Sequence, residues 1–157
     1  MVRRKSTNRS SKTSTKDLAP RRQPPFSLPD SEAQLAELSA LRRMIDASQH
    51  TFSLSGATCN SPALRDYLIE RLVAEVPNVA VLRLPLNPPD PLSLARDQVA
   101  KSNAAALFVV DLEKSLPSSD SHHPILRELN AAREKWAAGI HAPVVFWLPD
   151  YAATLFA

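Results

Sequence analysis

Several residue types are scarce in this 157-residue chain, and each scarcity excludes a class of protein. Cys59 is the single cysteine, which excludes an internal disulfide and a metal site made only of cysteines. The longest apolar runs, AAALFVV and APVVFWL, fall far short of the roughly 20 residues that a membrane-spanning helix needs. No apolar run follows the early arginines, as a secretory signal would require. We therefore expect a cytoplasmic protein without a membrane partner.

Basic residues are concentrated at the start of the chain. Residues 1–25 hold eight of them against one acid, Asp17, so this stretch carries +7; because the whole chain carries +3, the remainder carries −4. Residues 1–29 are rich in Ser, Thr, Pro and basic residues, with almost nothing apolar, which predicts a disordered tail. Such an arm either binds nucleic acid, through residues such as Arg3, Arg4 and Lys5, or is a solvated leader without a specific partner.

From residue 30 onward, helical and strand patterns alternate. Ser31 and Gln34 have capping-box spacing before a first amphipathic helix. Later helices open near Pro62, with Leu64, Leu68 and Leu72 predicted to face inward, and near Pro91. One further helix is predicted from Pro124 to Trp136. Apolar strands are predicted at 51–57, 79–84, 104–110 and 143–148, and 149–157 predicts the start of one more helix.

Helices between successive strands imply parallel pairing through crossover connections. We therefore expect an α/β domain over residues 30–157, with an open, mainly parallel sheet of at least four strands and helices on both faces. An apolar helical pattern still runs at Ala157, so we expect this domain to be truncated at its C-terminal end.

Ligands of open parallel sheets bind beyond the carboxyl ends of the strands, so the residue after each strand is a candidate. A phosphate loop of the form G-x-x-x-x-G-K-[ST] needs glycines, a lysine and a hydroxyl. Gly56 is the only glycine near the first strand, and lysine is absent between Lys16 and Lys101. Gly56 and the helix start at Ser61 are the cofactor-binding candidates, with Ser61 alternatively serving only as a helix cap.

A pair of carboxylates follows the third predicted strand, in the phrase ALFVVDLE. Asp111 and Glu113 resemble the acids of P-loop NTPases that bind magnesium and polarise the attacking water. They are the candidate catalytic residues, and Asp111 is the candidate metal ligand. Alternatively, they only mark the point where a buried strand leaves the core.

Other reactive side chains have a functional and a structural interpretation. A helix N-terminus could activate Cys59 as a nucleophile, but no spacing places a histidine base beside it. Asp120 could hold a metal together with two neighbouring histidines, or these are ordinary loop and cap residues. The two histidines beside Asp120 are His122 and His123, and the possible bases for Cys59 are His50, His122, His123 and His141. Three aromatic residues, Trp136, Phe146 and Trp147, are predicted to anchor the core or an interface, since none belongs to a basic aromatic cluster.

Three segments resemble a known group of proteins: FSLSGATCNSPALRDYLIERL, AALFVVDLEKSLPSSDSHHPILRELNAAREKW and PVVFWLPDYAATLFA. They are similar to the degenerate ATPase-like segment near the front of large bacterial tetratricopeptide-repeat proteins, which is related to the STAND signalling ATPases. The resemblance implies a P-loop NTPase-like fold with Asp111, and less directly Glu113, as its Walker B acids. It also implies a fifth strand, a helical lid and repeats beyond Ala157. In better-understood STAND proteins this domain is a nucleotide-dependent switch that controls oligomerisation.

Three hypotheses follow for the function. The first is a non-catalytic P-loop NTPase-like module, a regulatory or interaction platform in a bacterial signalling or scaffold protein. It needs no cofactor, and its partners are proteins or its own C-terminal region. The second is an active STAND-type switch that binds ATP and magnesium through Asp111, Glu113 and the Ser61 helix start. The third is a nucleic-acid-binding protein that acts through the basic tail.

Overall fold

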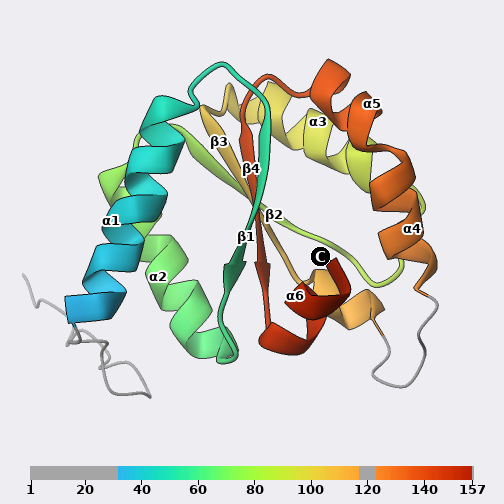
Figure 1. The fold of residues 1–157 in the computed structure, drawn as a ribbon. Helices are drawn as coiled ribbons and strands as arrows, with labels where there is room; N and C mark the ends of the chain where they lie inside the picture. The colour runs from blue at the N-terminus through green and yellow to red at the C-terminus, as the bar shows by residue number, and fades with distance from the viewer. Residues whose placement is uncertain (1–31, 117–122, 157) are drawn as a thin grey trace, which may run out of the picture.

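The computed structural model describes residues 32–116 and 123–156. The predicted tail, the Ser31 cap, and the loop residues Asp120 and His122 therefore lie outside the described residues. Within the described ranges the chain folds into one sheet with helices on both faces (Figure 1). The elements are α1 (Glu32–Ala47), β1 (Ser53–Thr58), α2 (Pro62–Glu75), β2 (Val79–Arg83), α3 (Pro91–Ser102), β3 (Ala106–Val110), the 3-10 helix η1 (Leu112–Ser115), α4 (Pro124–Ala131), α5 (Arg133–Gly139), β4 (Pro143–Leu148) and α6 (Asp150–Phe156).

The sheet has four strands in the order β1-β4-β3-β2, and every pairing is parallel. The predicted fold class, an open parallel α/β sheet, is thus confirmed. Strands β3 and β4 lie in the centre, and every residue in them is buried. This explains their unbroken apolar sequence, since a central strand is covered on both faces. Strand β1 occupies one edge of the sheet and β2 the other.

Each face of the sheet carries its own core. Helices α1 and α2 cover one face, and α3, α4, α5 and α6 cover the other (Figure 1). Successive side chains of a strand point to opposite faces. Accordingly, Phe108 and Trp147 pack towards α1 and α2, edge to face with 5.7 Å between ring centroids. Trp136 of α5 packs against Phe146 on the opposite face, at 5.8 Å. The predicted core role of these aromatic residues is confirmed.

Helix α2 turns a different side to the sheet than its leucines predict. Leu64 and Leu68, expected to face inward with Leu72, are only half-buried, whereas Arg65 and Ile69 are buried with Leu72. The helix packs on the sheet through the row at 65, 69 and 72, so Leu64 and Leu68 face α1 instead. An arginine consequently enters the interior of the molecule.

The segment predicted as one helix from Pro124 to Trp136 is divided into α4 and α5 at Ala132. Neither glycine nor proline marks this break, and its cause is not evident in the sequence. The amide of Ala132 still donates to the carbonyl of Glu128 at 2.9 Å. The two helices therefore follow each other with their hydrogen bonding almost continuous.

The left-handed backbone positions are filled without glycine. The chain has two glycines in all, and the described non-glycine residues with positive φ are His50, Asn78, Asn87, Asn103 and Asp111. Asparagine, aspartate and histidine tolerate this conformation better than other side chains do. Asp111, at φ 71°, is the one that directly follows a central strand.

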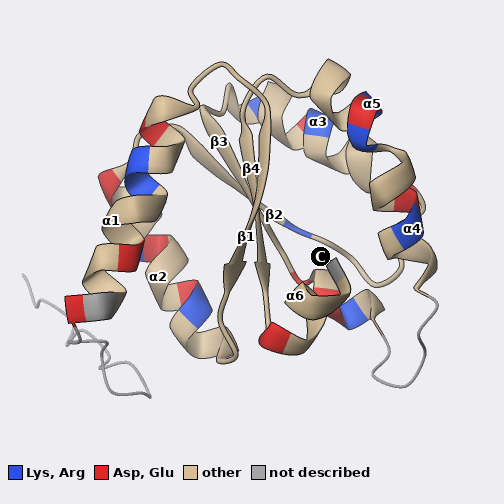
Figure 2. Cartoon of the chain, in the orientation of Figure 1, with Lys and Arg blue, Asp and Glu red and all other residues tan. Residues whose placement is uncertain are grey.

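Charged side chains lie on the helices and at the ends of strands, while the body of the sheet is free of them (Figure 2). No helix in the described ranges is both long enough and apolar enough to cross a membrane.

Candidate functional site

The carboxyl ends of the four parallel strands lie at the same end of the sheet, which we call the carboxyl end (Figure 1). The sequence predicts a ligand site there. Asp111 follows β3 immediately, and Arg83 is the last residue of the neighbouring strand β2. Cys59 follows β1, and Asp150 opens α6 after β4. Parallel pairing thus brings together polar residues that are far apart in the sequence.

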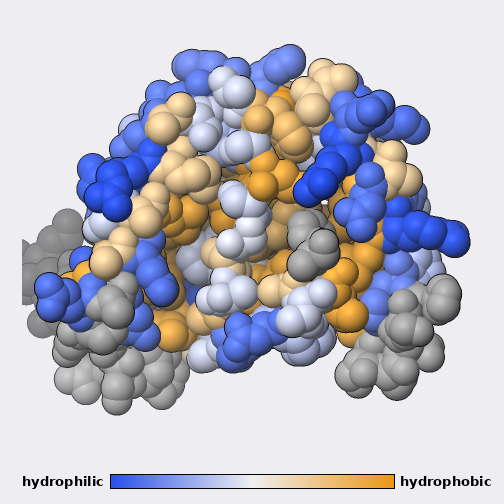
Figure 3. Space-filling view, viewed as in Figure 1, coloured by the Kyte–Doolittle hydropathy of each residue, from blue (hydrophilic) through white to orange (hydrophobic). Residues whose placement is uncertain are grey.

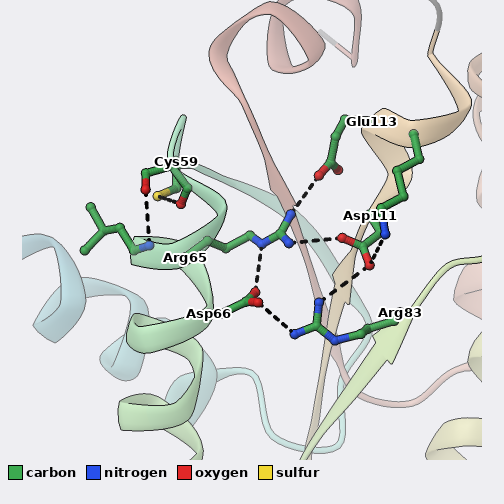
Figure 4. A network of polar contacts seen from close by, with 9 residues as sticks. Cys59, Arg65, Asp66, Arg83, Asp111 and Glu113 are labelled. Carbon is green, nitrogen blue, oxygen red and sulfur yellow. Dashed lines mark hydrogen bonds and ion pairs between the residues drawn. The ribbon is translucent and has the colours of Figure 1, made fainter. Parts of the chain in front are cut away.

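Arg65 contacts three acidic side chains near the carboxyl end of the sheet (Figure 4). Its Nη2 donates to Oδ1 of Asp111 at 3.0 Å, and its Nη1 donates to Oε1 of Glu113 at 2.7 Å. Its Nε donates to Oδ1 of Asp66 at 3.2 Å. The side chain of Arg65 is only 6% exposed, as is that of Asp111. One guanidinium therefore joins both predicted catalytic acids to a third carboxylate.

Two further cations complete this ionic cluster, which we define as Arg65, Asp66, Arg83, Asp111, Glu113 and Lys114. Nζ of Lys114 lies 3.0 Å from Oδ2 of Asp111, and Nη1 of Arg83 lies 3.5 Å from the same oxygen. Nη2 of Arg83 also contacts Asp66 at 3.1 Å. Three positive and three negative side chains thus balance each other, and each oxygen of the Asp111 carboxylate has a cationic partner.

Local structure explains why these groups converge. Ser61 caps α2 by accepting a hydrogen bond from the amide of Leu64 at 3.3 Å, and Pro62 occupies the first turn. Arg65 lies one turn later, on the side of the helix that faces the sheet. The left-handed backbone of Asp111 turns the chain from β3 into η1, which carries Glu113 back towards the same guanidinium.

The charges of the cluster fix the protonation states within it. Burial alone would raise the pKa of Asp111, but the hydrogen bond from Lys114 and the positive charges of Arg65, Lys114 and Arg83 lower it below its ordinary value of 3.8. Burial would likewise lower the pKa of Arg65, but its hydrogen bonds and charge contacts with Glu113 and Asp66 raise it. Both groups are therefore ionised at neutral pH, and the pair is a salt bridge.

The two cofactor-binding candidates, Gly56 and Ser61, lie in β1 and at the start of α2. Gly56 lies within the strand, has no positive φ, and would accept a Cβ whose nearest neighbour is the Phe146 carbonyl oxygen at 4.0 Å. Its backbone freedom is therefore not used. The hydroxyl of Ser61 is occupied as the cap of α2. Both residues fit a structural role at this position.

The turn after β1 is tied to the end of β4. The amide of Cys59 donates to the carbonyl of Leu148 at 2.9 Å. The side chain of Asn60 donates to Asp150 Oδ2 at 2.7 Å and accepts from the amide of Asp150 at 2.9 Å. The turn is thus held by α6 as well as by the sheet.

The remaining candidates are not brought together. The thiol of Cys59 donates to the Ser61 carbonyl at 3.4 Å, and no hydrogen bond from it to a histidine is present among the described residues. His123 is buried at the start of α4, whereas His50 and His141 are exposed. The described ranges contain no group of three His, Cys, Asp or Glu side chains that could hold a metal ion.

Sequence reasoning identified Asp111 and Glu113 but missed their partners Arg65, Arg83 and Lys114. Arg65 is separated from the two acids by 46 and 48 positions, so no local pattern links them. One signal was available: an arginine occupies the row that otherwise holds Ile69 and Leu72 on α2. Comparison with known proteins adds no assignment, since no protein-family model and no curated protein matches this chain.

Proposed function

We propose that this chain is a non-catalytic P-loop NTPase-like module, a regulatory or interaction platform within a larger bacterial signalling or scaffold protein. Its site of action is the cytoplasm, and its partners are proteins or further parts of its own polypeptide. In this proposal the chain is related to STAND-type, tetratricopeptide-repeat-associated segments but does not hydrolyse ATP.

The order of the strands supports a P-loop NTPase-like fold. Strand β4 lies between β1, where a phosphate loop would follow, and β3, which is followed by Asp111. An additional strand at this place is what distinguishes the P-loop ATPases that the sequence resembles. The resemblance in the sequence and the topology therefore point to the same type of fold.

The observation that carries the proposal is the contact of Arg65 with both predicted catalytic acids, at 3.0 and 2.7 Å. Magnesium binds to carboxylate oxygens that are free to coordinate it. Here Arg65 contacts Oδ1 of Asp111, and Lys114 contacts Oδ2. The residues present do not fit a magnesium site, and the Gly56–Ser61 turn offers neither the glycines nor the lysine for a triphosphate. We derive no ATPase chemistry from this end of the sheet.

Calorimetric titration with magnesium-ATP tests the proposal. We expect no binding heat beyond dilution for the wild-type chain, and none for Asp111→Ala. Asp90→Ala is a matched control, because this acid caps α3 and lies outside the ionic cluster. Micromolar binding that Asp111→Ala abolishes and Asp90→Ala retains would instead establish the active nucleotide switch.

A further inference from the structure

A cavity of about 550 Å³ lies between α1, the end of β1 and the beginning of α2. It shares no residue with the ionic cluster. Half-buried leucines of both helices line it, together with the indole of Trp147 on the sheet. Apolar side chains are accessible in the hollow between α1 and β1 (Figure 3). The apolar lining consists of Leu38, Leu41, Ala57, Leu64, Leu68 and Trp147.

The size and lining of the cavity are those of a small-molecule site. Ligand pockets typically measure about 300–1,000 Å³ and are predominantly apolar, with a few polar groups that orient the ligand. Helices packed on a sheet normally fill such a space with side chains. Here the leucines of α1 and α2 leave it open, so a ligand would remove their apolar surface from water.

The charge of the cavity selects the ligand. Of the described residues that line it, Glu37 alone is charged, and no arginine or lysine is among them. Glu37 takes part in no ion pair with another described residue. At the other end, Asn60 binds Asp150 and the Ser61 hydroxyl caps α2, so these two polar groups are already engaged. A phosphate-bearing or other anionic ligand would therefore find one acid and no cationic partner.

We infer that this cavity binds a small apolar cation, whose hydrocarbon body lies among the leucines and Trp147 and whose ammonium group pairs with Glu37. The inference goes beyond the proposed function and does not depend on it, because the cavity and the ionic cluster are separate. The cavity includes the Gly56–Ser61 turn, so the two tests are separated by their variants: nucleotide binding that needs Asp111 contradicts the proposed function, whereas the charge preference that needs Glu37 tests this site.

Three molecules of matched shape test the site: 3-phenylpropylamine, 3-phenylpropanol and 3-phenylpropionate. Cys59 lines the cavity and is the only cysteine of the chain, so its alkylation by N-ethylmaleimide, followed by mass spectrometry, reports occupancy. We expect the amine to slow alkylation with a dissociation constant on the order of 1 mM, in keeping with about ten non-hydrogen atoms. The alcohol should bind about threefold more weakly, as expected for loss of one exposed ion pair, and the carboxylate more weakly still.

Glu37→Gln provides the decisive comparison, because it removes the charge but keeps the shape of an exposed side chain. This variant should bind amine and alcohol equally, while Asp46→Asn, on the same helix but outside the cavity, should keep the preference for the amine. Fluorescence of Trp147 in a Trp136→Phe background gives a second readout that does not depend on the thiol. Equal protection by amine and alcohol in the wild type, or no protection by any of the three, would overturn the inference.

Discussion

At the scale of single residues, Arg65 decides what the carboxyl end of the sheet can do. A buried guanidinium loses several kcal/mol of hydration, which only well-placed acceptors can offset. Arg65 has three carboxylates within 3.2 Å, and two of them are the acids that a catalytic site would need. The same contacts that make the arginine tolerable in the interior engage one oxygen of Asp111 and one of Glu113, while Lys114 contacts the second oxygen of Asp111.

Replacing Arg65 should destabilise the fold strongly. We expect Arg65→Met to lower the free energy of unfolding by about 3 kcal/mol, the lower end for a broken buried pair, since Arg83 and Lys114 still contact Asp111. Arg71→Met is the matched control on the same helix: its arginine is exposed and, among the described residues, pairs with Glu75, so a loss of about 0.5 kcal/mol is expected. Urea unfolding measures both. Equal losses would show that the buried contacts of Arg65 stabilise the fold no more than an exposed ion pair does.

The lowered pKa of Asp111 predicts a stability that depends on pH. A carboxylate whose pKa is lower in the folded than in the unfolded state stabilises the fold at pH values above its ordinary pKa of 3.8. This contribution is lost as the pH falls through the pKa of the folded state. Asp111→Asn removes the titration and tolerates the left-handed backbone at φ 71°. Between about pH 6 and about pH 3, the free energy of unfolding should therefore fall less in Asp111→Asn than in the wild type. Parallel curves for the two proteins would contradict the assignment.

At the scale of helices and strands, the sequence predicted what is local. Strand β4 was predicted with its observed bounds, and α3 at Asp90-Pro91, because an apolar run and a proline-aspartate start are local signals. The position of β4 between β1 and β3 is a long-range property of the sheet.

The candidate site was predictable only in part, because its residues come together through long-range packing that local sequence signals do not encode. Two acids after a buried strand are visible in the sequence, but their neutralisation depends on which side of α2 faces the sheet. The leucines at 64, 68 and 72 indicated one side, and the observed packing uses the row at 65, 69 and 72. The displaced leucines line the cavity beside α1.

Gly56 tests whether the end of β1 is a strand or a phosphate-binding turn. Because Gly56 has no positive φ and its nearest potential contact is 4.0 Å away, Gly56→Ala should leave stability unchanged or raise it by up to about 1 kcal/mol. Gly139→Ala should gain less, since its Cβ would lie 3.1 Å from the Arg96 side chain. Thermal unfolding measures both. A marked loss of stability in Gly56→Ala would mean that the backbone there needs glycine.

At the scale of the whole molecule, two sides of α2 carry two different features. Its sheet-facing side closes the carboxyl end of the sheet through Arg65, and its α1-facing side leaves a cavity. The turn that precedes it is tied to β4 and α6 through Cys59 and Asn60. An open parallel α/β sheet thereby carries, after β3, two acids that pair with a guanidinium supplied by the chain itself.

The most direct test of this account is a titration with Mn²⁺, a paramagnetic substitute for magnesium, followed in the amide NMR spectrum of the labelled chain. If Arg65 and Lys114 occupy the Asp111 carboxylate, the amide signals of residues 110–114 should broaden no more than those of residues elsewhere in the chain. Selective broadening of residues 110–114 at micromolar Mn²⁺ would contradict the account, because it would place a metal ion on the acids that Arg65 is proposed to hold.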